Sequence, residues 1–227
     1  MVLMPRFARV IVPDCPHHIT HRGNRHEDVF FSPQDRDIYR SLLREYADRH
    51  ALSIIAYCLM TNHIHLVAIP ALDDSLAKSV GLAHRRYSRF INKERVWTGH
   101  IWANRYFSTP LDEPHALAAI KYVELNPVRA GLVSRAEDYP WSSARSHAFG
   151  IPDPLLSPDH TLLDAYGIND WSSWLSESLD NATINEIRKN TNTGWPTGSE
   201  EFIKRLETML GRRLTRKCAG RKKSKCE

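Results

Sequence analysis

Long apolar runs and closely spaced cysteines are both missing from this sequence of 227 residues. No apolar stretch approaches the ~20 residues that a helix needs to cross a bilayer, and no charged and then apolar signal segment opens the chain. The four cysteines show neither a CxxC spacing nor the density of a disulfide scaffold; they are Cys15, Cys58, Cys218 and Cys226. We therefore expect a cytoplasmic protein that has no membrane partner.

Basic residues outnumber acidic residues in the first part of the chain and in its last 16 residues. The formal net charge of +5 divides into +4 over residues 1–150, −6 over 151–211 and +7 over 212–227. The run Arg85 to Lys93 contains four cations and no acid. Basic surfaces attract polyanions because binding releases counterions, so nucleic acid is the expected class of partner. A solvated, solubilising basic surface is the alternative explanation.

The composition fits one globular domain with an appendage, since 42% of the residues are hydrophobic. A stretch rich in Pro and Asp at 150–160 is the best boundary. We expect a first domain over 1–148, a helical region over 149–211 and a basic, mobile tail over 212–227. Short helices are expected within the second region near 171–179, 181–189 and 199–210.

Two histidines, His63 and His65, occur in the strand-like stretch Tyr57 to Pro70. With a period of two, both imidazoles share one face and stand roughly 6–7 Å apart at their roots, while Ile64 and Val67 are assigned to the opposite face. Two rings at that spacing can share one metal ion, which makes the strand half of a metal site. An isolated His-x-His is more often only a polar strand face.

The elements around this stretch follow the order β-α-β-β-α-β. A first strand is expected from two short extended pieces, Arg9–Pro13 and His17–His21. Further strands are expected at Ser53–Leu59, the histidine stretch and His100–Ser108, with helices starting after Ser32 and after Asp73. This order predicts an α+β fold of the ferredoxin-like or RRM-like type, a four-stranded antiparallel sheet with helices on one face. The open face is where the histidines are expected to work.

A further helix is expected to carry Tyr122 and Asn126. It begins at Asp112 and ends before Pro127, because proline disfavours helical geometry in the residue that precedes it. Residues four apart on a helix project in nearly the same direction, so a tyrosine and an amide are presented together beside the sheet. Three other tyrosines lack a potential metal ligand one helical turn away; they are Tyr87, Tyr106 and Tyr139. On these residues alone, a boundary tyrosine with a capping Asn is the alternative.

Together these motifs resemble a known family. His63-Ile-His65 followed by Tyr122-Val-Glu-Leu-Asn-Pro is similar to the HUH endonuclease superfamily and, within it, to the Y1 transposases of the IS200/IS605-like group. The fuller match resembles the REP-associated tyrosine transposases, which act on repeated extragenic palindromes in bacteria. It runs through His18–Arg25, Ala56–Met60, His84–Tyr87 and Trp141–Ala144.

The resemblance implies a metal-dependent endonuclease and strand transferase for single-stranded DNA. Tyr122 would be the nucleophile that forms a 5′-phosphotyrosine, and His63, His65 and Asn126 would hold Mg²⁺ or Mn²⁺. A divalent ion stabilises the charge that develops on a phosphate under attack, so these residue types suit the implied roles. The first domain, 1–148, would then be the catalytic domain, with the helix of Tyr122 added to the sheet.

The implied partner is single-stranded or hairpin DNA, bound near the nucleoid by a monomer or a homodimer. Phosphate and base contacts are expected from one loop and one helix face, which contain Arg22, Asn24, Arg25, Arg85, Arg86, Arg89 and Lys93. Two other functions stay open on the sequence alone. One is a DNA- or RNA-hairpin-binding regulator with a vestigial site, and the other is a metal-dependent hydrolase that activates water.

Overall fold

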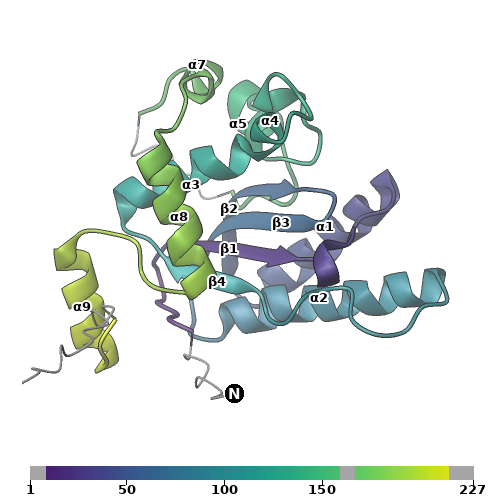
Figure 1. Cartoon of the computed structure of the whole chain (residues 1–227), viewed down its shortest axis with the longest axis horizontal. Helices are drawn as coiled ribbons and strands as arrows, with labels where there is room; N and C mark the ends of the chain where they lie inside the picture. Colours follow the sequence, from purple (N-terminus) through teal and green to yellow (C-terminus); the bar gives the residue numbers. More distant parts are fainter. Residues whose placement is uncertain (1–8, 159–166, 215–227) are drawn as a thin grey trace, which may run out of the picture.

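The computed structural model describes residues 9–158 and 167–214. Its strands form one antiparallel sheet in the order β2-β3-β1-β4 (Figure 1). Their bounds are β1 (His17–Arg22), β2 (Leu52–Leu59), β3 (His63–Pro70) and β4 (Phe107–Pro110). The predicted α+β fold with a four-stranded antiparallel sheet is confirmed, but Arg9–Pro13, predicted as part of the first strand, forms no strand, since a turn with a positive φ at Asp14 separates it from β1.

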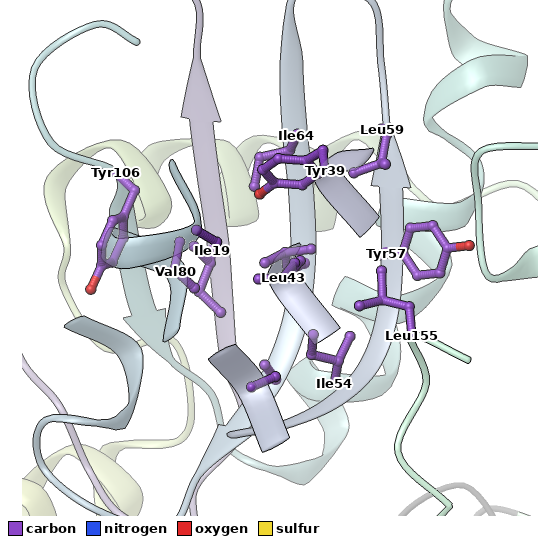
Figure 2. Packing of buried hydrophobic residues seen from close by; sticks show 14 of the residues in the cluster. Ile19, Tyr39, Leu43, Ile54, Tyr57, Leu59, Ile64, Val80, Tyr106 and Leu155 are labelled. Atoms are coloured by element: carbon purple, nitrogen blue, oxygen red, sulfur yellow. The ribbon is translucent and has the colours of Figure 1, made fainter. Parts of the chain in front are cut away.

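Helices α1 (Pro33–Arg49) and α2 (Ser75–Glu94) cover one face of this sheet (Figure 1). Helix α1 starts where the sequence predicts, because the side chain of Ser32 accepts a hydrogen bond from the backbone N–H of Asp35, and the Asp35 carboxylate accepts one from the backbone N–H of Ser32. The buried side of α1, which carries Tyr39 and Leu43, packs on the sheet (Figure 2). Full burial of a side chain such as Leu43 stabilises the fold by about 1.5–3 kcal/mol.

The opposite face is covered by α3 (Glu113–Glu124), with α8 (Asn181–Thr193) beside it (Figure 1). Alanines at 116 and 119 allow α3 to approach the strands closely. Shorter elements complete this layer: α4 (Asn126–Arg129), α5 (Ala144–Phe149), α7 (Trp171–Ser176) and the 3₁₀ helix η2 (Ala136–Asp138). Another 3₁₀ helix, η1 (Asn24–His26), follows β1. Thus the helix of Tyr122 packs on the sheet face that α1 and α2 leave open.

Strand β3 contributes to both cores with a period of two. Ile64 packs with the α1 and α2 layer, whereas Val67 packs with the α3 layer, on the same face as His65. The assignment of Val67 to the face of Ile64 was wrong, because the two positions differ by three, an odd number, and strand side chains alternate between faces.

The fourth strand is shorter than predicted. Only Phe107–Pro110 pairs as β4, and the aromatic run before it meets β1 through a single bridge between Trp102 and Gly23. Asn104 has a positive φ of 54°, which interrupts the extended conformation. The aromatic content that indicated a strand here instead serves packing, since Trp102 is part of the α1 and α2 core.

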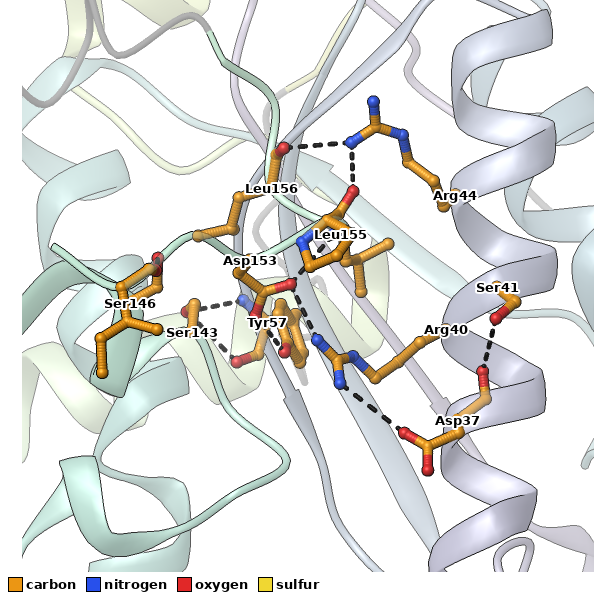
Figure 3. Close-up of polar contacts among 12 residues, drawn as sticks. Asp37, Arg40, Ser41, Arg44, Tyr57, Ser143, Ser146, Asp153, Leu155 and Leu156 are labelled. Carbon is orange, nitrogen blue, oxygen red and sulfur yellow. Dashed lines mark hydrogen bonds and ion pairs between the residues drawn. The ribbon is translucent and has the colours of Figure 1, made fainter.

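The segment after residue 150 is fixed against α1 and β2 (Figure 3). The carboxylate of Asp153 forms an ion pair with Arg40 at 2.8 Å and accepts a hydrogen bond from the Tyr57 hydroxyl at 2.6 Å. Leu155 then enters the core formed with α1 and α2. This stretch, predicted as a boundary, therefore packs closely on the first part of the chain, and the division at residue 148 stays a prediction.

The predicted C-terminal helices are present as α7, α8 and α9 (Glu200–Leu210). Helix α9 packs with Val10 and Val12 in a third apolar cluster, in which Leu214 is only 2% exposed. The backbone of Thr197 pairs with Leu111 just after β4. The first residues of the predicted basic tail are thus packed, while 215–227, for which we predict mobility, lie outside the described residues.

Two of the four cysteines lie within the described residues. Cys15 and Cys58 are free, buried thiols. Cys218 and Cys226 lie outside the described ranges. None of the helices in the described parts of the chain is long and apolar enough to span a bilayer.

Candidate active site

The two predicted histidines and the predicted tyrosine meet on the sheet face that α3 covers. The ring centroids of His63 and His65 lie 5.1 Å apart, and those of His65 and Tyr122 lie 5.6 Å apart. A third ring, that of His18 on β1, lies 5.8 Å from Tyr122. The antiparallel pairing of β1 with β3 explains the grouping. Thr20 lies directly opposite His65, and Arg22 lies directly opposite His63. His18 is on the same face of β1 as Thr20 and Arg22, because strand side chains alternate.

A chain of hydrogen bonds fixes the tautomer of His65. The Thr191 hydroxyl donates to the carbonyl of Ile187 at 2.6 Å, so its oxygen accepts from Nδ1–H of His18 at 2.7 Å. Nε2 of His18 therefore carries a lone pair and accepts from Nδ1–H of His65 at 2.9 Å. Nε2 of His65 is then left with a lone pair and has no hydrogen-bond partner among the described residues.

The neighbouring Asn62 holds His63 in the same Nδ1–H tautomer. The Asn62 amide nitrogen donates to the carbonyl of His26 at 3.2 Å, which turns the amide oxygen toward His63. That oxygen accepts from Nδ1–H of His63 at 2.6 Å. Both predicted ligands thus present a deprotonated Nε2, the arrangement in which outer hydrogen bonds orient metal-bound histidines.

The charge state of these rings suits metal binding. Burial lowers the pKa of His63 to about 4, with a further contribution from the positive charge of Arg22. Burial likewise holds the pKa of His65 well below its usual range and lowers that of His18 to about 3. All three imidazoles are therefore neutral near pH 7, the state in which a histidine can coordinate a metal ion.

Asn126 does not extend the helix of Tyr122, although it follows by four residues. Helix α3 ends at Glu124, Leu125 adopts φ −79° and ψ 0°, and Asn126 opens the short helix α4. Its side chain is 9% exposed and forms no hydrogen bond to a described residue. Among those residues, no three His, Cys, Asp or Glu side chains are grouped to hold a metal ion. Two imidazoles with oxygen ligands fit Mn²⁺ or Mg²⁺, and Asn126 stays the predicted third ligand.

Two arginines lie against Tyr122. The guanidinium of Arg129 lies 4.1 Å from the centroid of the tyrosine ring and donates to the backbone carbonyl of Tyr122 at 2.6 Å. Its Nη1 is buried and has no hydrogen-bond partner among the described residues. Nε of Arg188, from α8, lies 3.4 Å from the tyrosine hydroxyl. Positive charge is thus concentrated around a side chain that is only 5% exposed.

Helix α3 is anchored by a buried carboxylate two residues after Tyr122. Glu124 has no exposed surface and accepts hydrogen bonds from Ser143 at 2.5 Å, His147 at 2.6 Å and Trp171 at 2.7 Å. A carboxylate that receives several hydrogen bonds is held in one position. The end of α3 that presents Tyr122 is therefore fixed in its place.

The predicted DNA-binding residues separate into two places. Arg22 lies opposite His63, and the tight loop that follows contains Asn24 and Arg25. Glycine is needed at position 23 for space, since a Cβ there would lie 2.1 Å from a backbone oxygen, and its φ of −58° is accessible to any residue. The other four cations are exposed on α2, on the opposite side of the sheet from Tyr122; they are Arg85, Arg86, Arg89 and Lys93.

Sequence reasoning missed four residues around Tyr122. His18 could have been predicted, because strand alternation places it on the face of β1 that adjoins the two histidines of β3. Arg129 belongs to the tyrosine motif but had no role of its own. Thr191 and Arg188 come from α8, and only the folded chain brings them to the site.

The four-stranded sheet, the paired histidines and the helical tyrosine have the arrangement expected of HUH nucleases. The chain belongs to the family described as IS200-like transposases, whose model matches residues 11–126, just over half of the sequence. It is also 25% identical over 116 residues to a curated relative in Haemophilus influenzae, named as a REP-associated tyrosine transposase. That match spans 46% of this chain and 66% of the relative, slightly less than two thirds of its length.

The fold is also found among solved structures. It is similar, with a TM-score of 0.52 and 18% identity, to a REP-associated tyrosine transposase bound to a REP hairpin. The similarity covers 69% of this chain and 93% of that one. A transposase structure from Deinococcus radiodurans R1 has a TM-score of 0.38 and 20% identity, covering 53% of this chain and 96% of that one.

Proposed function

We propose that this protein is a metal-dependent nuclease and strand transferase that acts on single-stranded DNA beside hairpins of palindromic repeats. The observation that carries the proposal is the position of Tyr122 beside two neutral histidines whose Nε2 atoms are free. A nucleophile next to candidate ligands for a divalent ion is suited to phosphodiester chemistry. Membership in the IS200-like transposase family supports DNA as the substrate.

The proposed reaction is a transesterification. The Tyr122 oxygen attacks the phosphorus of a phosphodiester, a bond forms between them, and the bond from phosphorus to the 3′ oxygen breaks. The phenolic proton is lost and the departing 3′ oxygen gains one, so the products are a 5′-phosphotyrosine and a free 3′-hydroxyl. The covalent intermediate conserves the phosphoester for later joining.

The residues around Tyr122 have distinct proposed roles. Arg129 and Arg188 attract and orient the phosphate through their positive charge. His63, His65 and Asn126 would hold Mg²⁺ or Mn²⁺, and the bound ion supplies Lewis acidity at a non-bridging phosphate oxygen. The histidine tautomers fixed by His18 and Asn62 support this assignment.

The proposed substrate is DNA of the REP hairpin type, since the structurally similar transposase is bound to such a hairpin. Tyr122 lies beside both histidines of its own chain, so we propose a site that acts in cis, in a monomer or a homodimer. Its place of action would be chromosomal DNA in the cytoplasm.

The test is a denaturing gel on a hairpin with single-stranded flanks, labelled at its 3′ end and incubated with Mn²⁺ or Mg²⁺. The wild type should acquire the label covalently, and Tyr122→Phe should not. Tyr139→Phe is the matched control, because that hydroxyl donates to the carbonyl of Leu59 at 3.0 Å and lies in no candidate site. Hairpin binding without cleavage under either ion would instead indicate a regulator, and cleavage by Tyr122→Phe would indicate a hydrolase that activates water.

A further inference from the structure

A cavity of about 470 Å³ opens between α2 and the segment 99–106, across the sheet from Tyr122. None of the described residues that line it is acidic. Four of its lining residues are arginines, contributed by three separate parts of the chain: Arg9, Arg85, Arg89 and Arg105. We call it the α2 cavity.

No carboxylate in the described parts of the chain balances the charge of these arginines. None of the four forms an ion pair with a carboxylate of the described residues. The guanidinium of Arg9 lies 3.7 Å from the centroid of the Tyr106 ring and donates to the Tyr106 carbonyl at 3.0 Å. Burial lowers the pKa of Arg9, and the nearby charge of Arg105 adds to the lowering. Unbalanced cations around a concave surface favour an anionic ligand.

The wall of the α2 cavity also carries polar atoms that lack partners. Nε1 of Trp102, Oη of Tyr106 and Oδ1 of Asn92 are buried and have no hydrogen-bond partner among the described residues. Trp102 and Tyr106 are each only 6% exposed. Most buried polar groups in proteins are hydrogen-bonded, so these atoms require a ligand or water. Together they offer donors and an acceptor, as the edge of a nucleobase requires.

The aromatic wall is rigid and its other polar groups are already used. Nε2–H of His21 donates to the Ala103 carbonyl at 3.0 Å, and Nδ1–H of His84 donates to Nδ1 of His21 at 2.8 Å. The Tyr39 hydroxyl donates to Nε2 of His84 at 2.8 Å. Both imidazoles stack on Trp102, with centroids 4.9 and 4.3 Å away. The indole is therefore held in place, and its Nε1–H stays available.

Gly81 keeps the α2 cavity open. It lies inside α2 and lines the cavity, and a Cβ at this position would meet no atom within 4 Å. Glycine in a helix interior lowers stability relative to alanine. The surrounding protein gives no steric reason for glycine here, so close approach of a ligand to the helix is a sufficient one.

The backbone connects the α2 cavity to the candidate active site. Asn24 N–H donates to the Ile101 carbonyl at 2.8 Å, and Ala103 N–H donates to the Arg22 carbonyl at 2.9 Å. Arg22 lies opposite His63 on the neighbouring strand. A DNA strand that leaves the active site past Arg22 therefore reaches the segment that forms one wall of the cavity.

We propose that the α2 cavity binds one unpaired nucleotide of the DNA that flanks the hairpin. Its base contacts the free polar atoms of Trp102, Tyr106 and Asn92, and its phosphates contact the surrounding arginines. The inference rests on the proposed function and adds to it the place where a base outside the duplex is held.

The test is an abasic scan of the single-stranded flank, measured by fluorescence anisotropy with the full-length protein. For the wild type, removal of one particular base should weaken binding about tenfold, the scale of a lost base contact. Gly81→Phe fills the cavity, so it should weaken binding to intact DNA by a similar factor and abolish the penalty at that position.

Substitutions on α2 provide the matched control. Arg89→Gln should reduce the penalty at that position, because Arg89 lines the cavity. Arg86→Gln removes the same charge from an exposed neighbour that does not line it, so it should weaken all DNAs uniformly and leave the tenfold penalty. If Gly81→Phe does not fold, Tyr106→Phe and Trp102→Phe take its place with the same expected loss of the penalty.

The outcomes separate this inference from the proposed function. If the wild type forms the Tyr122 adduct but no base shows a penalty, the α2 cavity does not bind a nucleotide. A penalty that is equal in the wild type and in every cavity variant also overturns the inference. If the wild type binds no hairpin DNA at all, the proposed function itself fails.

Discussion

Nε2 of His18 lies 2.9 Å from Nδ1 of His65, and the two rings are stacked with centroids 5.1 Å apart. His18 also reaches Thr191 of α8, so a C-terminal helix and the first strand together determine which nitrogen of His65 is free. The candidate metal ligand is thus oriented by residues from two distant parts of the sequence.

Thr191→Val should free His65 from its fixed tautomer. Valine matches the shape of threonine but cannot accept from His18, so His65 should no longer be held as the Nδ1–H tautomer. Long-range proton–nitrogen spectra of metal-free protein with labelled histidine read the tautomer directly, and Mn²⁺ affinity by calorimetry should fall about tenfold or more. Thr193→Val, on the same helix but exposed, is the control and should leave the spectrum unchanged. A wild-type His65 protonated on Nε2 would contradict the assignment.

Glu124 should be a major contributor to stability. Glu124→Ala leaves three buried donors without their acceptor, and we expect a loss of about 3–5 kcal/mol in the free energy of unfolding, measured with urea. Glu186→Ala, an exposed carboxylate on α8, should change it by about 0.5 kcal/mol or less. Equal effects of the two substitutions would show that the buried carboxylate does not anchor α3.

Acid should destabilise the protein through its buried histidines. Burial lowers the pKa of His17 to about 4 in the folded chain, whereas an unfolded histidine titrates near 6.5. The unfolded state therefore binds more protons between these values, and stability falls as the pH falls from 6.5 to about 4. At pH 5 the loss from this one group is on the order of 2 kcal/mol. His17→Gln should narrow the difference between urea midpoints at pH 7 and pH 5, and an unchanged difference would exclude this cause.

Two glycines should respond to alanine in opposite ways. Gly81→Ala should raise the free energy of unfolding by about 0.5–1 kcal/mol, since the position is helical and a Cβ meets nothing. Gly194 ends α8 with a positive φ of 72°, so Gly194→Ala should lower stability by about 1 kcal/mol or more. Thermal unfolding of both variants gives the comparison, and a destabilising Gly81→Ala would show that the space at that position is not open.

The sequence predicted well those parts of the fold that depend on local signals. Ser32 and Pro33 defined the start of α1, and Asp112 defined the start of the helix of Tyr122, which ends at Glu124, two residues earlier than Pro127 indicated. The alternation around His63 and His65 placed both rings on one face. Caps, prolines and strand periodicity act over a few residues, so they can be seen without the structure.

The parts that could not be predicted depend on contacts between distant residues. The aromatic run before β4 indicated a longer strand, but Trp102 is used to stack on His21 and His84, and the positive φ of Asn104 interrupts pairing. Thr191 lies 173 positions from His18. Such pairs follow from the packing of α8 on the sheet, which no local pattern in the sequence shows.

The central claim is that Tyr122 forms the covalent bond to DNA. The most direct measurement is mass spectrometry of the adduct after nuclease and protease digestion, together with polymerase extension of the released fragment. We predict a 5′-phosphorylated nucleotide on the peptide containing Tyr122 and a released fragment whose free 3′-hydroxyl can be extended. Attachment to Tyr87, Tyr106 or Tyr139, or a phosphate left on the 3′ end of the released fragment, would contradict the account.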